Sequence, residues 1–146
     1  MRSAILAIAF LLPLPVVAQP DADAQEIKSF RLTDASLAKY AQATRNIRRL
    51  PIGNCDLTSP AIAIDELASK LAAAPGAKTA VASAGMTTRE YVVFGLAVAH
   101  SAMATYGADK AGGALPAGTQ SNVEFYKKHE GEFSELAGVP QTGGCG

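Results

Sequence analysis

Residues 87–106, TTREYVVFGLAVAHSAMATY, constrain the fold more than any other stretch of this chain. The stretch is apolar on almost every side, and a helix of that kind must be covered by other elements. Thr87 and Glu90 have the spacing of an N-terminal capping box, and Gly107 stands where a helix commonly ends in a left-handed residue. Because the stretch is also too long for a buried strand, the sequence predicts a hydrophobic central helix over about 87–106.

Residues 1–18 have the three parts of a secretory signal peptide. Arg2 gives the positive start, residues 4–12 form the apolar run, and residues 16–18 give a cleavage site of small side chains. A retained membrane anchor is the alternative, but the apolar run is shorter than the roughly 20 residues that span a bilayer. We therefore expect an exported protein, periplasmic or secreted, with no transmembrane span after cleavage.

The rest of the chain divides into an acidic leader, residues 19–29, which we expect to be flexible, and a helical domain over residues 30–146. Apolar side chains recur at helical spacing in three further stretches, which begin near Thr33, Ser59 and Ser121. Turn residues separate these stretches, and none of them alternates like a strand. The sequence thus predicts an all-α, four-helix bundle-like single domain around the central helix.

A second capping box is predicted at the start of the last helix, where Ser121 precedes Glu124 by three residues. We interpret all four residues of the two boxes, Thr87 and Glu90 with Ser121 and Glu124, as helix caps. The two glutamates therefore have a structural explanation, and neither is needed as a catalytic acid.

Cys55 and Cys145 are the two cysteines of the chain. In an oxidising compartment, an even and well separated pair most simply forms a disulfide. Closing so long a loop would stabilise the fold by roughly 4–5 kcal/mol on the chain-entropy model. A reactive thiol pair is the alternative, but the C-x-x-C spacing of a redox motif is absent.

Charge and small residues bear on the partners of this chain. The 13 basic and 13 acidic side chains balance, so nothing electrostatic points to nucleic acid or an anionic membrane as a partner. Gly95 and Ala99 lie one turn apart on the central helix and allow another backbone to approach closely. Tight packing inside the domain is the first explanation, and a homodimer seam is the second.

Three segments resemble a family of small uncharacterised bacterial proteins that carry export signals. They are SFRLTDASLAKY at 29–40, AGMTTREY at 84–91 and LPAGTQSNVEFY at 115–126. Members of the family share three similar motifs with this chain. The first helix starts with Leu-Thr, a hydrophobic helix starts with Ala-Gly-x-[Ser/Thr]-x-Arg-Glu-[Tyr/Phe], and the last helix starts with Leu-Pro-x-Gly…Asn-Val-x-Phe. The resemblance covers roughly residues 30–136 and implies a helical exported protein of bacterial origin. It implies no activity and no functional residues.

The two histidines, His100 and His129, are candidates for a metal or haem site. If the third and fourth predicted helices are antiparallel neighbours, the two rings meet at similar heights. They could then bind a transition metal with Glu130, Glu132 or a tyrosine, or ligate haem iron axially. No spacing in the chain is diagnostic of either site. The alternative is one half-buried, hydrogen-bonded histidine and one surface histidine.

A pocket near Asn122, Tyr126 and His129 is the remaining candidate for chemistry, because the first two lie one turn apart beside the third. No nucleophile motif and no carboxylate pair accompanies them. We therefore expect no enzyme and predict no cofactor. The first hypothesis is a non-enzymatic exported module that binds a protein partner or a small apolar ligand. A metal- or haem-binding bundle and an enzyme of unknown reaction are the alternatives.

Overall fold

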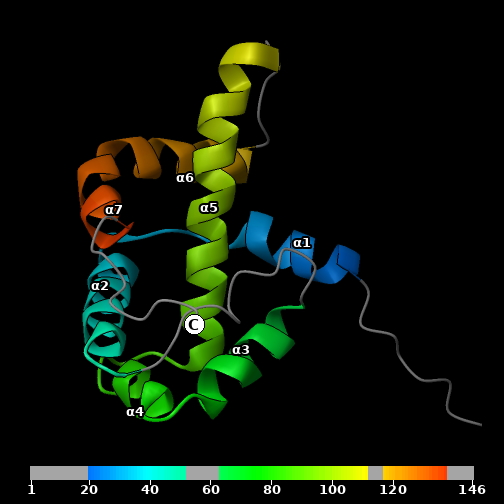
Figure 1. Cartoon of the computed structure of the whole chain (residues 1–146). Coiled ribbons are helices and arrows are strands. Elements are labelled where there is room, and N and C mark those ends of the chain that lie inside the picture. The colour runs from blue at the N-terminus through cyan, green and yellow to red at the C-terminus, as the bar shows by residue number, and fades with distance from the viewer. Residues whose placement is uncertain (1–19, 52–62, 112–116, 138–146) are drawn as a thin grey trace, which may run out of the picture.

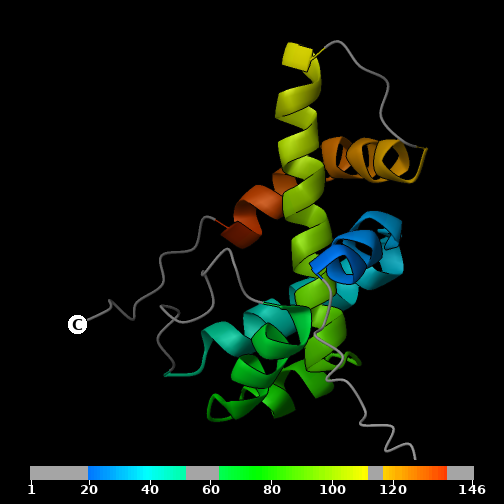
Figure 2. The same ribbon diagram turned by 90° about the vertical axis from the view of Figure 1, so that its right-hand side faces the viewer.

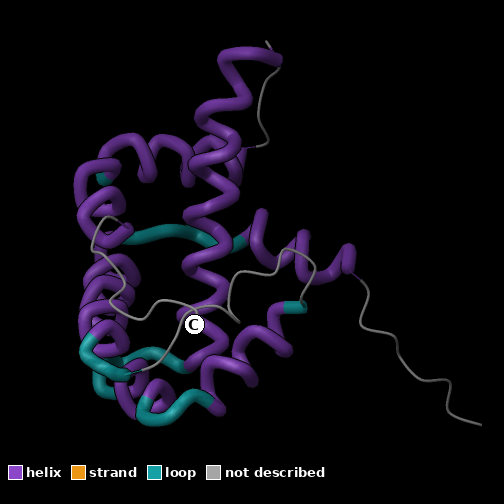
Figure 3. The backbone as a smooth tube through the Cα atoms, in the orientation of Figure 1, coloured by secondary structure: helices purple, strands orange, loops and turns teal. Residues whose placement is uncertain are grey.

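The computed structural model describes residues 20–51, 63–111 and 117–137. Within these ranges the chain forms helices joined by short loops and contains no strand (Figure 3), so the predicted all-α class is confirmed. The helices are α1 (Pro20–Ser29), α2 (Asp34–Arg48), α3 (Ile64–Ala73), α4 (Ala77–Ala82), α5 (Thr88–Ala111), α6 (Ala117–Lys128) and α7 (Glu130–Ala137). No helix in the described part of the chain is both long and apolar enough to cross a membrane.

Helix α5 is the axis of the structure, and shorter helices surround it (Figure 1). In the two perpendicular views, α1 and α6 run across α5 rather than alongside it (Figures 1 and 2). The sequence predicts four main helices, whereas the described residues form seven. The arrangement is therefore a set of short helices wrapped around one long helix. The predicted signal peptide at residues 1–18, the predicted helix start at Ser59 and the predicted disulfide between Cys55 and Cys145 lie outside the described residues.

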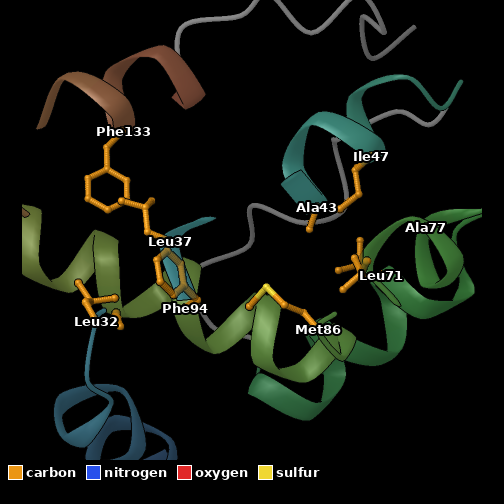
Figure 4. Close-up of a cluster of buried hydrophobic side chains, with 11 residues drawn as sticks. Leu32, Leu37, Ala43, Ile47, Leu71, Ala77, Met86, Phe94 and Phe133 are labelled. Carbon is orange, nitrogen blue, oxygen red and sulfur yellow. The ribbon is translucent and has the colours of Figure 1, made fainter. Parts of the chain in front are cut away.

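The core is centred on Phe94 of α5, whose side chain is fully buried. The ring of Tyr40 from α2 stacks on it at 4.5 Å, and Phe30 from the link between α1 and α2 meets it edge-on at 6.2 Å. Phe133 of α7 closes the far side at 6.5 Å. Figure 4 shows Phe133 and Leu37 pointing toward Phe94. Segments from both ends of the described chain thus meet on one aromatic side chain.

Among the described side chains of α5, fully buried ones occur only as far along the helix as Ser101. Val93 and Ala97 are buried beside Phe94, but Met103 is 67% exposed and Tyr106 is 62% exposed. The upper turns of α5 project beyond α6 in Figure 1. The prediction of a helix sheathed along its whole length is therefore wrong for its second half. The apolar composition of a helix indicates which side chains should be buried, but the number of helices that pack against it determines how many of them are buried.

The predicted end of the central helix at Gly107 is also wrong, because α5 continues to Ala111. A Cβ atom built on Gly107 would meet nothing within 4 Å, so neither the glycine nor its surroundings require a turn there. Glycine permits a left-handed residue but does not impose one, and it costs a helix interior only about 1 kcal/mol relative to alanine.

The predicted flexible leader is helix α1, and its acidic side chains explain the difference. Arg89 of α5 donates to Glu26 of α1 and, at 2.9 Å, to Asp65 of α3. The hydrogen bond from Arg89 lowers the pKa of Glu26 below its ordinary value. Asp23 accepts a hydrogen bond of 2.9 Å from the first backbone N–H of α3. Side chains that suggest a solvated leader in the sequence therefore have partners on two other helices.

The predicted capping box of the last helix is wrong as well. Helix α6 begins four residues before Ser121, whose hydroxyl donates to the carbonyl of Gly118 at 3.1 Å. Glu124 accepts from Gln120 at 3.3 Å instead of reaching back to Ser121. Residues three apart share one face anywhere in a helix, so the Ser-x-x-Glu spacing also occurs inside one. The helix is then interrupted at His129, where the single predicted helix becomes α6 and α7.

Replacing Phe94 by alanine should remove the centre of the core. We expect Phe94→Ala to lower the free energy of unfolding by about 3–5 kcal/mol, because the surrounding rings cannot fill the cavity. Met103→Ala on the same helix is the matched control and should change it by less than about 0.5 kcal/mol. Urea unfolding followed by far-ultraviolet circular dichroism measures both. Equal losses in the two variants would contradict this assignment of the core.

Candidate functional site

Asn122, predicted as a pocket residue, is used to fix the link between α1 and α2. Its side chain lies in α6 and the residue is only 4% exposed. The Oδ1 atom accepts a hydrogen bond of 3.0 Å from the N–H of Leu32, and Nδ2 donates to the carbonyl of Phe30 at 2.6 Å. Both ends of the amide are therefore engaged with backbone, which explains why this polar side chain is buried.

His129 lies between two carboxylates. Its Nδ1 atom is 2.9 Å from Oε2 of Glu132, one turn further along the chain. Its Nε2 atom is 3.0 Å from Oδ1 of Asp34 at the start of α2, without the alignment of a hydrogen bond. The ring packs against Phe125, with 4.4 Å between ring centroids. Both ring nitrogens thus face acidic groups of this same chain.

His100 is half-buried on α5, whereas the partners of His129 are Glu132, Asp34 and Phe125. The described residues contain no group of three or more His, Cys, Asp or Glu side chains that is arranged to hold a metal ion. The geometry therefore gives no support to a metal or haem site that uses His100 and His129 together.

Tyr126 belongs to the aromatic packing of the last two helices. Its ring stacks on Phe133 at 5.5 Å. The neighbouring hydroxyl of Tyr106 donates to Glu130 at 3.1 Å, and this hydrogen bond raises the pKa of Tyr106. Asn122, Tyr126 and His129 therefore have separate partners, and the structure does not assemble them around one reacting group.

Thr87 and Glu90 make both hydrogen bonds of a capping box. The N–H of Thr87 donates to Oε2 of Glu90 at 2.7 Å, and the N–H of Glu90 donates to Oγ1 of Thr87 at 3.1 Å. The hydrogen bond from the Thr87 backbone, and then the interaction of the Thr87 hydroxyl with the carboxylate, lower the pKa of Glu90. The two residues satisfy backbone donors at the start of α5, and this use accounts for their polar groups.

A cleft between α2, α3 and α5 is a candidate site that the sequence analysis did not find. Its volume is about 240 Å³. The side chains that line it come from three helices and carry no formal charge: Tyr40, Leu67, Leu71, Tyr91, Val92, Gly95 and Leu96. In the sequence, only the positions of Gly95 and Tyr91 on the central helix relate to this cleft, and they indicate close packing rather than a ligand site.

Gly95 sets the shape of this cleft, hereafter the tyrosine cleft. A Cβ atom at Gly95 would lie 3.3 Å from the hydroxyl oxygen of Tyr40, so any other residue would crowd that ring. Tyr40 in turn stacks on Tyr91 at 4.7 Å. The homodimer seam that Gly95 and Ala99 suggest is therefore occupied at Gly95 by a side chain of the same chain.

Hydroxyl groups supply the polar chemistry of the tyrosine cleft. The hydroxyls of Tyr91 and Thr44 lie 3.1 Å apart and share a hydrogen bond. Burial, and then the neighbouring Tyr91, raise the pKa of Tyr40 well above its ordinary value. The Tyr40 phenol therefore stays protonated at neutral pH and can donate a hydrogen bond. The cleft combines an apolar wall with uncharged donors and acceptors.

Comparison with known proteins adds no family to this description. No protein-family model, no curated protein and no solved structure matches the chain. The chemistry of the described residues therefore carries the functional argument that follows.

Asn122 offers a direct test of whether these polar groups serve structure. Asn122→Ala leaves the buried N–H of Leu32 without a partner, which should cost about 1–3 kcal/mol of unfolding free energy. Ser121→Ala, its neighbour on α6, removes only a hydrogen bond that is exposed to water and should cost less than about 0.5 kcal/mol. Thermal and urea unfolding measure both. If Asn122→Ala kept full stability, a role outside the fold would have to be found for this amide.

Proposed function

We propose that this chain is an exported helical binding module that takes a small, uncharged, mainly apolar molecule in the tyrosine cleft. The observation that carries the proposal is the lining of that cleft. Its seven residues include no charged side chain, whereas 18% of the whole chain is charged. Ligand sites are typically apolar hollows with a few placed polar groups, and this cleft has that composition.

The size of the cleft limits the ligand. At about 240 Å³ it is smaller than the roughly 300–1,000 Å³ that is usual for drug-sized ligands. One or two rings, or a short branched hydrocarbon, would fill it. An acceptor atom on the ligand would find the protonated Tyr40 hydroxyl, while a formal charge would find no counter-charge among the lining residues.

The assignment to an exported protein rests on the sequence. Residues 1–18 have the order of a signal peptide, and the resembling bacterial proteins carry export signals too. Export would place Cys55 and Cys145 in a compartment where disulfides persist. Both features belong to the proposal, together with the non-enzymatic role. The separate partners of Asn122, Tyr126 and His129 are the reason to prefer binding over catalysis.

An uncharged dye tests the cleft. 1-Naphthylamine, an uncharged two-ring dye whose emission depends on the polarity of its surroundings, should bind the purified chain saturably at a single site. Leu96→Trp places a larger side chain in the cleft and should raise the Kd for the dye at least about tenfold, which corresponds to about 1.4 kcal/mol. Because the chain has no tryptophan, the new indole also reports directly on its own surroundings.

Leu136→Trp is the matched control, since Leu136 is a half-buried leucine that lines a different groove, between α2 and α7. It should leave dye binding unchanged. Circular dichroism establishes that both variants are folded. Absence of saturable dye binding to the wild-type chain, or equal loss in the two tryptophan variants, would refute ligand binding in the tyrosine cleft.

Mass spectrometry of the purified protein tests both export and the disulfide. Full-length chain produced in a bacterial host should be recovered outside the cytoplasm with Gln19 as its first residue and without free thiols. Cys55→Ser should then lower the free energy of unfolding by up to roughly 4–5 kcal/mol, since the long loop would no longer be closed. An intact chain that starts at Met1, with two thiols open to alkylation, would contradict both predictions.

A further inference from the structure

A second hollow, here called the α2–α7 groove, carries charge of both signs. Its volume is about 270 Å³. Leu37 and Ala41 of α2 and Leu136 of α7 make it apolar, while charged side chains stand on its walls. They are Arg45 and Arg48 on α2, and Glu132 and Glu135 on α7.

The two charged walls do not neutralise each other within the chain. Arg45 donates to Gln42 on its own helix at 3.2 Å, and Glu132 contacts His129 at 2.9 Å. Among the described residues no ion pair crosses from α2 to α7 in this groove. Arg45, Glu132 and Glu135 are exposed, so their charges are available to a molecule that covers the groove.

We propose that the α2–α7 groove is the centre of a two-fold interface between two copies of this chain. A two-fold axis through the groove places the α2 wall of one copy over the α7 wall of the other. Arg45 and Arg48 of each copy then face Glu132 and Glu135 of its partner. The apolar residues of the two grooves meet at the axis, where contact between them removes apolar surface from water.

A second copy fits these charges better than other occupants. A purely acidic partner would be attracted by the arginine wall and repelled by the glutamate wall, and a purely basic partner would meet the reverse. A copy of the same surface presents both signs in the order that the two-fold axis requires. Since a stable interface usually buries about 800 Å² on each partner, the contact also includes exposed sides of α2 and α7 beyond the groove.

Charge reversal tests this interface in three samples. The first variant carries Arg45→Glu and Arg48→Glu, which makes both walls acidic. The second carries Glu132→Arg and Glu135→Arg, which makes both walls basic. The third sample is an equal mixture of the two variants. Sedimentation velocity from about 1 µM to about 1 mM measures association in each sample and in the wild-type chain.

The proposal predicts a wild-type dimer whose Kd rises with salt concentration, because exposed ion pairs are screened. Each variant alone should dimerise at least about tenfold more weakly, since like charges face one another across the axis. The mixture should form a heterodimer at least as tight as the wild-type dimer. That recovery separates an interface from simple damage to the fold, which mixing cannot repair.

Two outcomes would overturn the proposal. Monomers in every sample, the mixture included, would mean that another segment of the chain, a different partner or water covers the groove. A dimer that persists unchanged in both variants would place the interface on another surface. Circular dichroism and thermal unfolding establish beforehand that each variant has the wild-type helix content.

Discussion

The burial of Phe94 is the constraint on which the rest of this structure depends. Its ring is contacted by Phe30, Tyr40 and Phe133, which belong to segments far apart along the chain. These contacts fix the link between α1 and α2, the middle of α2 and the start of α7 against the central helix. Further along α5, beyond these contacts, Met103 lies open to solvent.

Most of the buried or paired polar groups near this core serve the backbone or tie helices together. Asn122 closes two backbone hydrogen bonds of the link before α2, and Arg89 joins α1 and α3 to the first turns of α5. Because an unpaired buried polar group costs free energy, the two Asn122 hydrogen bonds stabilise the contact between α6 and this link. The ion pairs of Arg89 are exposed and add a weaker link between α1, α3 and α5. The polar residues that first suggest a site therefore mainly stabilise the fold, and the candidate sites lie elsewhere.

The two candidate surfaces lie on different sides of α2 and differ in chemistry. Tyr40 turns toward α5 and contributes to the uncharged tyrosine cleft, whereas Ala41 and Arg45 turn toward α7 and line the charged groove. An uncharged hollow suits a small apolar molecule, and a hollow with opposite charges on its two walls suits a two-fold contact between copies. One helix thus contributes to two surfaces, because successive side chains of a helix point about 100° apart.

The sequence by itself determined the helical class, the start of the central helix at Thr87 and Glu90, and the start of α2 at Thr33. These features depend on local hydrogen bonds and on periodicity, both of which are determined by residues close together in the sequence. Only the tertiary structure decided that residues 20–29 form a helix and that the polar residues of α6 serve separate contacts. Each of these depends on partners distant in the chain. The tyrosine cleft and the α2–α7 groove likewise form only where helices that are distant in the sequence pack against one another.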